Sequence, residues 1–306
     1  MRFGVIGLGH MGGNLARLAI DKGHEVVGFN QDEDVTRSLA DDGLEPATTI
    51  EALVEALPRP RRVFLYVPHG DPTEEVCNQL QPLLESGDVV VDGGNSHWED
   101  SERRHGFFAE SGIHFLDVGT SGGVSGARQG ACFMAGGERD AYDLVEPLLR
   151  DLAVDGGAYY VGPSGSGHFS KLVHNAIEFG MVQAIAEGVE MLRRSDYELD
   201  LPGLFDNWNH GSVIRGWLVE LMGKGLQEHP DLAELSTYVE DTAEVKWVLN
   251  WANDHDIPTP VTTISQVALM QYRDLHWPMA KAVAILRNQY GGHPIHKEGE
   301  DAGGGD

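Results

Sequence analysis

Four side chains that could carry acid–base chemistry lie within one short stretch of the sequence. Lys171, His174, Asn175 and Glu178 are spaced at i, i+3, i+4 and i+7, which places them within roughly 100° of one face of a helix. The residues between them are largely apolar, so we expect the helix to be buried against its neighbours. Buried polar groups cost free energy unless they are satisfied or used. The face therefore offers a candidate base, a candidate acid and two hydrogen-bonding side chains.

The start of the chain has the pattern of a strand, a glycine-rich turn and a helix. Arg2–Gly7 reads as a buried strand, and a helical pattern then runs as far as Gly23. Between them lies a GxGxxG sequence made of Gly7, Leu8, Gly9, His10, Met11 and Gly12. In this context the glycines let a pyrophosphate approach backbone N–H groups at a helix N-terminus. The pattern favours dinucleotide binding over the alternative, a tight strand-to-helix turn without a ligand.

The end of the second strand, Glu25–Asn30, is where such a fold meets the adenosine ribose. Asn30, Gln31 and Asp32 stand there, and no basic residue follows until Arg37. An amide or a carboxylate can bind the ribose hydroxyls, whereas a 2′-phosphate prefers an arginine and is repelled by acidic side chains. The sequence therefore favours NAD, with NADP as the alternative.

Strand and helix patterns alternate through the first half of the chain. The further strand patterns are Arg62–Val67, Asp88–Asp92, His114–Val118, Cys132–Ala135 and Tyr159–Val161. Helical patterns between them are Thr73–Leu84, Glu99–Ser111 and Ala141–Leu149. This alternation predicts βαβ units and an α/β fold with a doubly wound, mostly parallel Rossmann-type sheet.

Two loops at predicted strand ends carry polar residues among glycines. They are Asp92–Ser96, which contains Asn95, and Gly119–Arg128, which contains Ser121. Ligands bind at the carboxyl ends of strands in such sheets, and these side chains can hydrogen-bond hydroxyls or a carboxylate. The alternative reading of each loop is ordinary turn chemistry.

The pattern becomes helical near residue 165, and no strand alternation returns. Expected helices are a long one from residue 165 to about Arg194, then Val213–Lys224, Glu244–Asp254, Thr262–Leu275 and Met279–Gln289. We predict a dinucleotide-binding domain over 1–164, an all-helical substrate and dimerisation domain over 165–296, and a disordered acidic tail over 297–306.

Composition narrows the classes of partner. The chain has 306 residues, with 48 acidic and 22 basic ones and a formal net charge of −26. Such a field repels nucleic acids and anionic membranes, and it suggests a salt-rich cytoplasm. Neither a membrane span nor a leader segment is expected, so we predict a cytoplasmic protein. Cys77 and Cys132 are far apart and expected to be small core residues, with no disulfide and no metal site.

Five motifs resemble the decarboxylating 6-phosphogluconate dehydrogenases, in particular their shorter bacterial and archaeal form. They are Gly7–Leu15, Asp92–Ser96, Ser121–Gly123 with Gly126–Arg128, Gly167–Glu178, and Arg287–His293. The broader β-hydroxyacid dehydrogenase superfamily shares the first, the third and part of the fourth. The pattern from His174 to Glu178 and the terminal motif select the narrower family.

The resemblance implies oxidation of 6-phosphogluconate at C3, loss of CO2 and ketonisation to ribulose 5-phosphate. Lys171 is implied as the base that takes the C3 hydroxyl proton and then polarises the 3-keto group, and Glu178 as the acid that protonates the enediol at C1. Burial of the helix would lower the lysine pKa as this role requires. The implied cofactor positions are the glycine-rich turn, Asn30, Gln31, Asp32, Val67 and Asn95, and no metal is called for.

The resemblance also implies the substrate-binding positions. Hydroxyls and the carboxylate would be held by Asn95, Ser121, Gly122, Gly123, His174 and Asn175. The phosphate would be held by Lys246, Arg273, Arg287 and His293, the last two from the partner of a homodimer or higher oligomer. Phe179 departs from the family, which has a phosphate-binding tyrosine there.

Three alternatives compete with this reading. The main one is a β-hydroxyacid dehydrogenase acting on a small unphosphorylated hydroxy acid, for which the four basic phosphate ligands would be superfluous. A silent dinucleotide-binding protein would have no need of both Lys171 and Glu178. A buried polar network between two domains would explain the lysine face without any chemistry, but not the other motifs.

Overall fold

The computed structural model describes residues 1–230, 232, 234–239, 244–273, 279, 282–283, 285–286 and 289. The chain forms two compact units. The first contains Met1–Glu178 and Ala243–Pro258, and the second contains Phe179–Thr242 and the chain from Thr259 onward. The predicted boundary at residue 164 thus differs from the division by compactness, because the first turns of a long helix and one later helix belong with the sheet.

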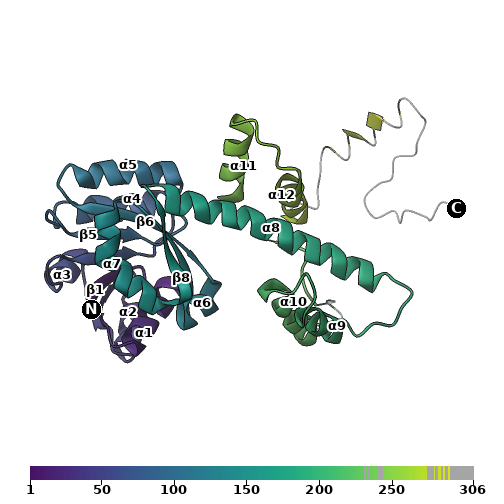
Figure 1. Cartoon of the computed structure of the whole chain (residues 1–306), viewed down its shortest axis with the longest axis horizontal. Coiled ribbons are helices and arrows are strands. Elements are labelled where there is room, and N and C mark those ends of the chain that lie inside the picture. Colours follow the sequence, from purple (N-terminus) through teal and green to yellow (C-terminus); the bar gives the residue numbers. More distant parts are fainter. Residues whose placement is uncertain are drawn as a thin grey trace. The chain divides into compact units, whose positions relative to one another are not determined.

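The first unit is built on an eight-stranded sheet with the order β3-β2-β1-β4-β5-β6-β7-β8 (Figure 1). All neighbouring strands are parallel except the antiparallel pair of β6 and β7. The strands are β1 (Arg2–Ile6), β2 (Glu25–Phe29), β3 (Glu45–Pro46), β4 (Arg62–Leu65), β5 (Val89–Asp92), β6 (His114–Ser121), β7 (Ala131–Gly136) and β8 (Ala153–Gly162). The predicted doubly wound, mostly parallel fold is confirmed.

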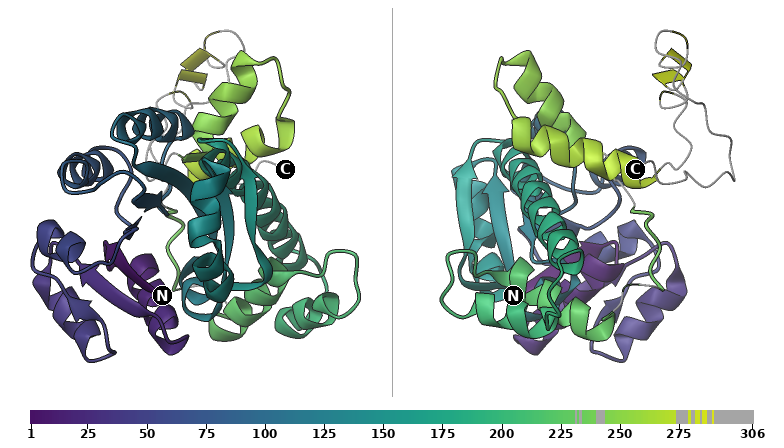
Figure 2. Two further views of the ribbon diagram at one scale, coloured as in Figure 1. Left: turned by 60° about the vertical axis from the view of Figure 1, so that its left-hand side comes forward. Right: turned by 90° about the vertical axis from the view of Figure 1, so that its right-hand side faces the viewer.

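Helices cover both faces of this sheet (Figure 2). One apolar cluster joins Phe3 and Val5 of β1 to α1 (His10–Asp21) and α7 (Arg139–Leu152). The other joins Ile6 of β1 to α3 (Ile50–Glu55), α4 (Asp71–Leu80) and α5 (Trp98–Ala109). Alternate residues of one strand are therefore buried on opposite faces, as expected for a parallel sheet.

The remaining helices of the described chain are α2 (Glu33–Ala40), α6 (Gly123–Gln129), α8 (Ser166–Arg193), α9 (Leu201–Asn209), α10 (Trp217–Glu228), α11 (Glu244–Asp254) and α12 (Pro260–Arg273). Past β8 every described element is a helix, as predicted. The predicted helix Met279–Gln289 and the predicted tail 297–306 lie largely or wholly outside the described residues.

Two local predictions were wrong. Gly119–Arg128 is not one loop, because β6 continues to Ser121 and α6 begins at Gly123. Cys77 is buried but Cys132 is exposed, since it lies on the outward side of β7, opposite Ser121 in the antiparallel pair.

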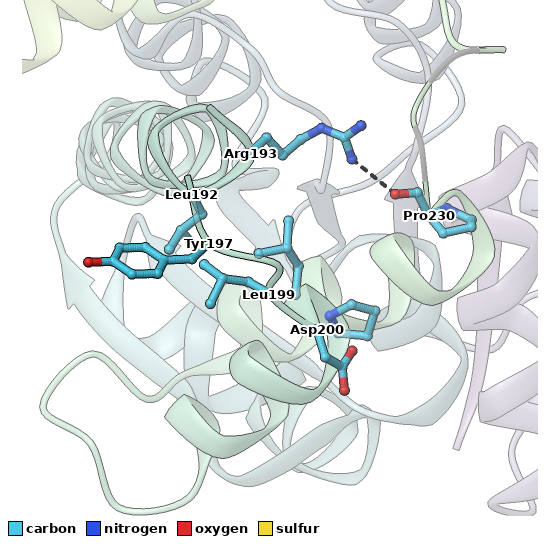
Figure 3. A pocket seen from close by; sticks show the side chains of 8 residues that line it. Leu192, Arg193, Tyr197, Leu199, Asp200 and Pro230 are labelled. Atoms are coloured by element: carbon cyan, nitrogen blue, oxygen red, sulfur yellow. Dashed lines mark hydrogen bonds between the residues drawn. The ribbon is translucent and has the colours of Figure 1, made fainter. Parts of the chain in front are cut away.

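The second unit has its own small apolar core, in which Val189 of α8 packs with Phe205 of α9 and with Leu226 of α10. Near the end of α8 lies a cavity of about 430 Å³, and two of its lining residues are joined by a hydrogen bond of 2.9 Å from Arg193 Nη1 to the Pro230 carbonyl (Figure 3). Its eight lining residues include none of the predicted site residues that the structure describes. No helix of the described chain is both long and apolar enough to cross a membrane.

Candidate active site

The glycine-rich turn has the geometry of a dinucleotide cradle. Gly7 has φ +92°, and a Cβ there would lie 2.4 Å from the Tyr66 carbonyl oxygen. A Cβ at Gly12 would lie 2.0 Å from the Gly7 carbonyl oxygen, so only glycine lets α1 approach β1 this closely. Gly9 precedes α1 and has open space around it, and the first turn of α1 carries no acidic residue. The residues present therefore fit a pyrophosphate at this helix N-terminus.

The side chain of Asn30 is hydrogen-bonded to the backbone of the glycine-rich turn and of the following segment. Its Oδ1 accepts from the backbone N–H of Leu8 at 3.0 Å, and its Nδ2 donates to the Asp32 carbonyl at 3.2 Å. Asp32 caps α2 by accepting from the N–H of Asp34 at 3.0 Å. Arg37 is bound by the carboxylates of Glu33 and Asp34, at 2.9 and 2.8 Å. This edge is thus acidic, and its one nearby arginine is already paired.

The loop after β5 is shaped by Asp92, which is fully buried. Its Oδ1 accepts from the N–H of Gly94 at 3.0 Å, and its Oδ2 accepts from the hydroxyl of Ser96 at 2.7 Å. The guanidinium of buried Arg104 lies 3.6 Å away. Asn95 lies between these two anchored residues, so its side chain leaves the sheet edge from a fixed backbone.

The start of α8 is fixed by Asp117 of β6. Its two carboxylate oxygens accept from the N–H groups of Gly165 and His168, both at 2.8 Å. Burial raises the pKa of Asp117, and the backbone donors oppose this. A Cβ at Gly167 would lie 2.2 Å from the Asp117 carbonyl oxygen, so the first turn of α8 touches the strand directly. The helix therefore projects from the sheet with a defined rotation.

That close approach continues one turn later at Gly119. A Cβ there would lie 2.4 Å from Cβ of Lys171. Because neither backbone can yield without shifting α8, we expect Gly119→Ala to lower the free energy of unfolding by about 1–3 kcal/mol in urea denaturation. Gly106→Ala is the control, since that site in α5 has open space and alanine favours a helix. Equal stabilities for the two variants would contradict this packing.

Lys171 is buried, with 7% of its surface exposed, and its Nζ donates to Asn175 Oδ1 at 2.7 Å. Burial lowers the pKa of Lys171 below its ordinary value of 10.5. The negative charges of Glu178 and Glu244, and the thiol of Cys132, act in the opposite direction. The site thus favours the neutral amine that a general base needs, while keeping carboxylates near the ammonium that forms later.

The predicted hydrogen-bonding residues form one network with this lysine. Ser121 Oγ lies 3.1 Å from His174 Nε2, and His174 Nδ1 lies 3.2 Å from Asn175 Oδ1. The amide oxygen can only accept, so Nδ1 carries a proton, and in the neutral imidazole Nε2 then accepts from the serine hydroxyl. Ser121, Lys171, His174 and Asn175 are therefore brought together as predicted.

Burial of the polar face is only partly as expected. Lys171 and Asn175 are buried, but the side chains of His174 and Glu178 are 41% and 43% exposed. His174 Nδ1 lies 3.8 Å from a Glu178 oxygen. The acid and the histidine therefore lie on the open part of the helix face.

Glu244, the first residue of α11, was not among the predicted site residues. Its Oε1 accepts from Asn95 Nδ2 at 3.2 Å and its Oε2 from Asn175 Nδ2 at 3.4 Å. The only sequence signal for Glu244 was its place in a predicted helix, two residues before Lys246. A helical pattern does not reveal contacts with residues 69 and 149 positions earlier in the chain.

The predicted phosphate ligands are only partly placed. Lys246 lies on α11 in the first unit, and Arg273 is the last residue of α12 in the second. Phe179 begins the second unit. Arg287 and His293 lie outside the described residues.

Two family models account for nearly all of the chain. The NAD binding domain of 6-phosphogluconate dehydrogenase matches residues 2–162, and the C-terminal domain of 6-phosphogluconate dehydrogenase matches residues 167–298. This chain belongs to the 6-phosphogluconate dehydrogenase family. The junction between the two family domains lies between residues 162 and 167.

Relatives within the 6-phosphogluconate dehydrogenase family match over most of their length. The chain is 42% identical to the Bacillus subtilis protein YqeC, which carries the family name, over 97% of this chain and 100% of YqeC. It is 41% identical to the NAD(+)-dependent, decarboxylating enzyme of Haloferax volcanii, over 85% of this chain and 87% of that protein.

Solved structures agree with this 6-phosphogluconate dehydrogenase fold. The Plasmodium falciparum enzyme superposes with a TM-score of 0.82 at 28% identity, over 98% of this chain and 67% of that one. Mycobacterium tuberculosis 3-hydroxyisobutyrate dehydrogenase superposes with a TM-score of 0.70 at 21% identity, over 89% and 92%, and shares the fold.

Proposed function

We propose that the chain oxidises and decarboxylates 6-phosphogluconate to ribulose 5-phosphate and CO2, with reduction of NAD. The observation that carries this proposal is the buried Lys171, whose pKa is lowered and whose amine is held by Asn175. Membership of the family supports the substrate, and a bound dinucleotide supplies the nicotinamide ring that accepts hydride from C3.

In this proposal Lys171 acts twice. As a neutral amine it removes the proton of the C3 hydroxyl while hydride leaves C3. As an ammonium it then donates a hydrogen bond to the 3-keto oxygen, so that the electron pair of the breaking bond to the carboxyl carbon is drawn toward that oxygen. CO2 leaves, and Glu178 delivers a proton to C1 of the five-carbon enediol.

The substrate hydroxyls and carboxylate are assigned to Asn95, Ser121, His174 and Asn175, with the backbone of Gly122 and Gly123 beside them. Ser121 is the last residue of β6, and Asn95 follows β5. Both therefore lie at the carboxyl edge of the sheet, the same edge as the glycine-rich turn after β1.

The test is an assay for NADH, CO2 and ribulose 5-phosphate with 6-phosphogluconate at high salt. 3-Hydroxyisobutyrate and tartronate-type acids are the comparison substrates. Turnover of these small acids without turnover of 6-phosphogluconate would replace the proposal by the β-hydroxyacid dehydrogenase alternative. Lack of turnover with all of them would favour a silent dinucleotide-binding protein.

NAD is proposed as the preferred cofactor because Asp32 caps α2 at the expected ribose end and Arg37 is already paired. We expect Asp32→Asn to raise kcat/KM for NADP relative to NAD about tenfold, since a like charge a few ångströms from a phosphate costs on the order of 1 kcal/mol near a surface. Asparagine preserves the helix cap, so folding should be unaffected. Asp41→Asn, at the other end of α2, is the matched control.

Steady-state rates with both cofactors measure this effect. An unchanged NADP-to-NAD ratio in Asp32→Asn would contradict the proposed role of that carboxylate. An equal change of this ratio in Asp41→Asn would show that the cofactor preference responds to the overall negative charge of the surface and not to Asp32 in particular.

We also propose a homodimer, or a higher oligomer, working in a salt-rich cytoplasm. Lys246 and Arg273 would bind the phosphate together with Arg287 and His293 of the partner. Light scattering at several salt concentrations would measure the oligomer. Active monomers would contradict the shared site.

A further inference from the structure

Glu244 contacts two residues of the candidate site at once. Each of its carboxylate oxygens accepts from a different amide, Oε1 from Asn95 and Oε2 from Asn175. Asn175 in turn accepts at its Oδ1 from Lys171. A continuous chain of hydrogen bonds thus joins the carboxylate, the amide and the amine.

We propose that Glu244 is a positioning residue for Lys171 and acts through Asn175. This inference rests on the proposed function, in which Lys171 is the base. It assigns to α11 a role in the chemistry at C3 that is separate from the phosphate-binding role of Lys246.

The side-chain amide of Asn175 has a donor, Nδ2, and an acceptor, Oδ1. A carboxylate accepts hydrogen bonds and cannot donate them, so Glu244 selects the orientation in which Nδ2 faces α11. Oδ1 then faces Lys171, as the distance of 2.7 Å requires. The reversed amide would set oxygen against carboxylate and N–H groups against the amine. Glu244 therefore fixes which side of the lysine amine is occupied by a hydrogen bond and which is left for the substrate.

The position of Glu244 is set by the rest of α11. The ring of Trp247 lies edge-on to His69 and His97, with centroids 5.1 and 5.0 Å away. One turn later Trp251 packs against Phe169 at 4.8 Å. These contacts hold the helix without help from the carboxylate, so the Glu244 oxygens are presented to the two amides in advance.

The charge of Glu244 has a second effect on Lys171. The charged or ionisable groups acting on that amine are Glu178 from the same helix, Glu244 from α11 and Cys132 from β7, and all three favour the ammonium against burial. Removing the Glu244 charge should therefore lower the pKa of Lys171 further. The neutral base would form at lower pH, but the ammonium needed for decarboxylation would be less stable.

The decisive experiment titrates Lys171 directly in Glu244→Gln. The chain has six lysines, so 13Cε signals of labelled lysine can be resolved and Lys171 assigned by its loss in Lys171→Met. We expect its midpoint to fall by about half a unit to one unit in Glu244→Gln. Asp254→Asn, at the far end of α11, removes the same charge and should leave the midpoint in place.

Kinetics provide the second readout. In Glu244→Gln we expect kcat with 6-phosphogluconate to fall about tenfold to a hundredfold, and the acid limb of kcat/KM to move to lower pH with the lysine midpoint. Glu244→Asp keeps the charge and should restore the pH position while recovering only part of kcat. The KM for NAD should change little in any of these variants.

An unmoved Lys171 midpoint in Glu244→Gln would overturn the inference, as would an equal shift in Asp254→Asn. A lower KM for 6-phosphogluconate with unchanged kcat would also overturn it, because Glu244 would then only repel the anionic substrate. The NMR titration needs no turnover, so failure of the proposed function leaves this test intact.

Discussion

Replacing Lys171 by methionine should lower kcat/KM for 6-phosphogluconate about 10³- to 10⁴-fold. The amine serves first as base and later as acid, and a positioned acid–base group contributes about 10²–10⁴ at each such step. Methionine fills a similar volume without a titratable group. The measurement is initial-rate NADH formation across pH, in the salt concentration that supports the wild-type chain.

The same variant should fold normally. Burying an amine opposes folding, and Asn175 Oδ1 retains a donor in His174 after the lysine is removed. Thermal unfolding should therefore show no loss of stability beyond about 1 kcal/mol. Turnover within about tenfold of wild type would exclude Lys171 as the base. If Lys171→Met proves to be unfolded, the same rates are measured on Lys171→Arg instead.

Replacing Glu178 by glutamine should separate the redox step from the protonation step. Glutamine has nearly the same shape but cannot deliver a proton to the enediol. We expect a burst of about one NADH per site in stopped flow, followed by turnover reduced about 10²- to 10³-fold. The half-exposed position of Glu178 makes the substitution mild for folding.

Glu190→Gln is the matched control on the same helix. Glu190 pairs with Arg194 at 2.6 Å, and an exposed pair of this kind contributes less than about 1 kcal/mol. Its kinetics should equal those of the wild type. Loss of the NADH burst in Glu178→Gln would contradict the assignment, because the glutamate would then be needed before or during hydride transfer.

Features that depend on local periodicity could be predicted from the sequence. The spacing of Lys171, His174 and Asn175 placed them on one helix face, and the glycine fingerprint located the turn after β1. The range Glu244–Asp254 was predicted as a helix with the bounds it has. Strand and helix alternation was enough for the sheet, because parallel strands are buried on both faces and carry a strong apolar signal.

Features that depend on distant parts of the chain could not be predicted. Glu244 meets Asn95 and Asn175 only after α11 has packed within the first unit, and the neighbouring residues in the sequence give no sign of these contacts. The two-residue strand β3 and the six-residue helix α3 are too short for a periodic pattern. Helix α6 was not predicted, because its glycines indicated a loop, whereas the chain forms a short helix there.

The rings that hold α11 have an optical consequence. They form one series of neighbouring contacts in the order His69, Trp247, His97, Trp98, Phe169, Trp251 and His255. Three of the six tryptophans are in it, each within 5.1 Å of an imidazole by ring centroid. Of these three, only Trp247 meets imidazoles from a distant part of the chain, because His97 is the neighbour of Trp98 in the sequence and His255 lies one turn after Trp251. We therefore expect the emission of Trp247 to respond to its contacts with His69 and His97, and so to report whether α11 is seated beside the lysine site.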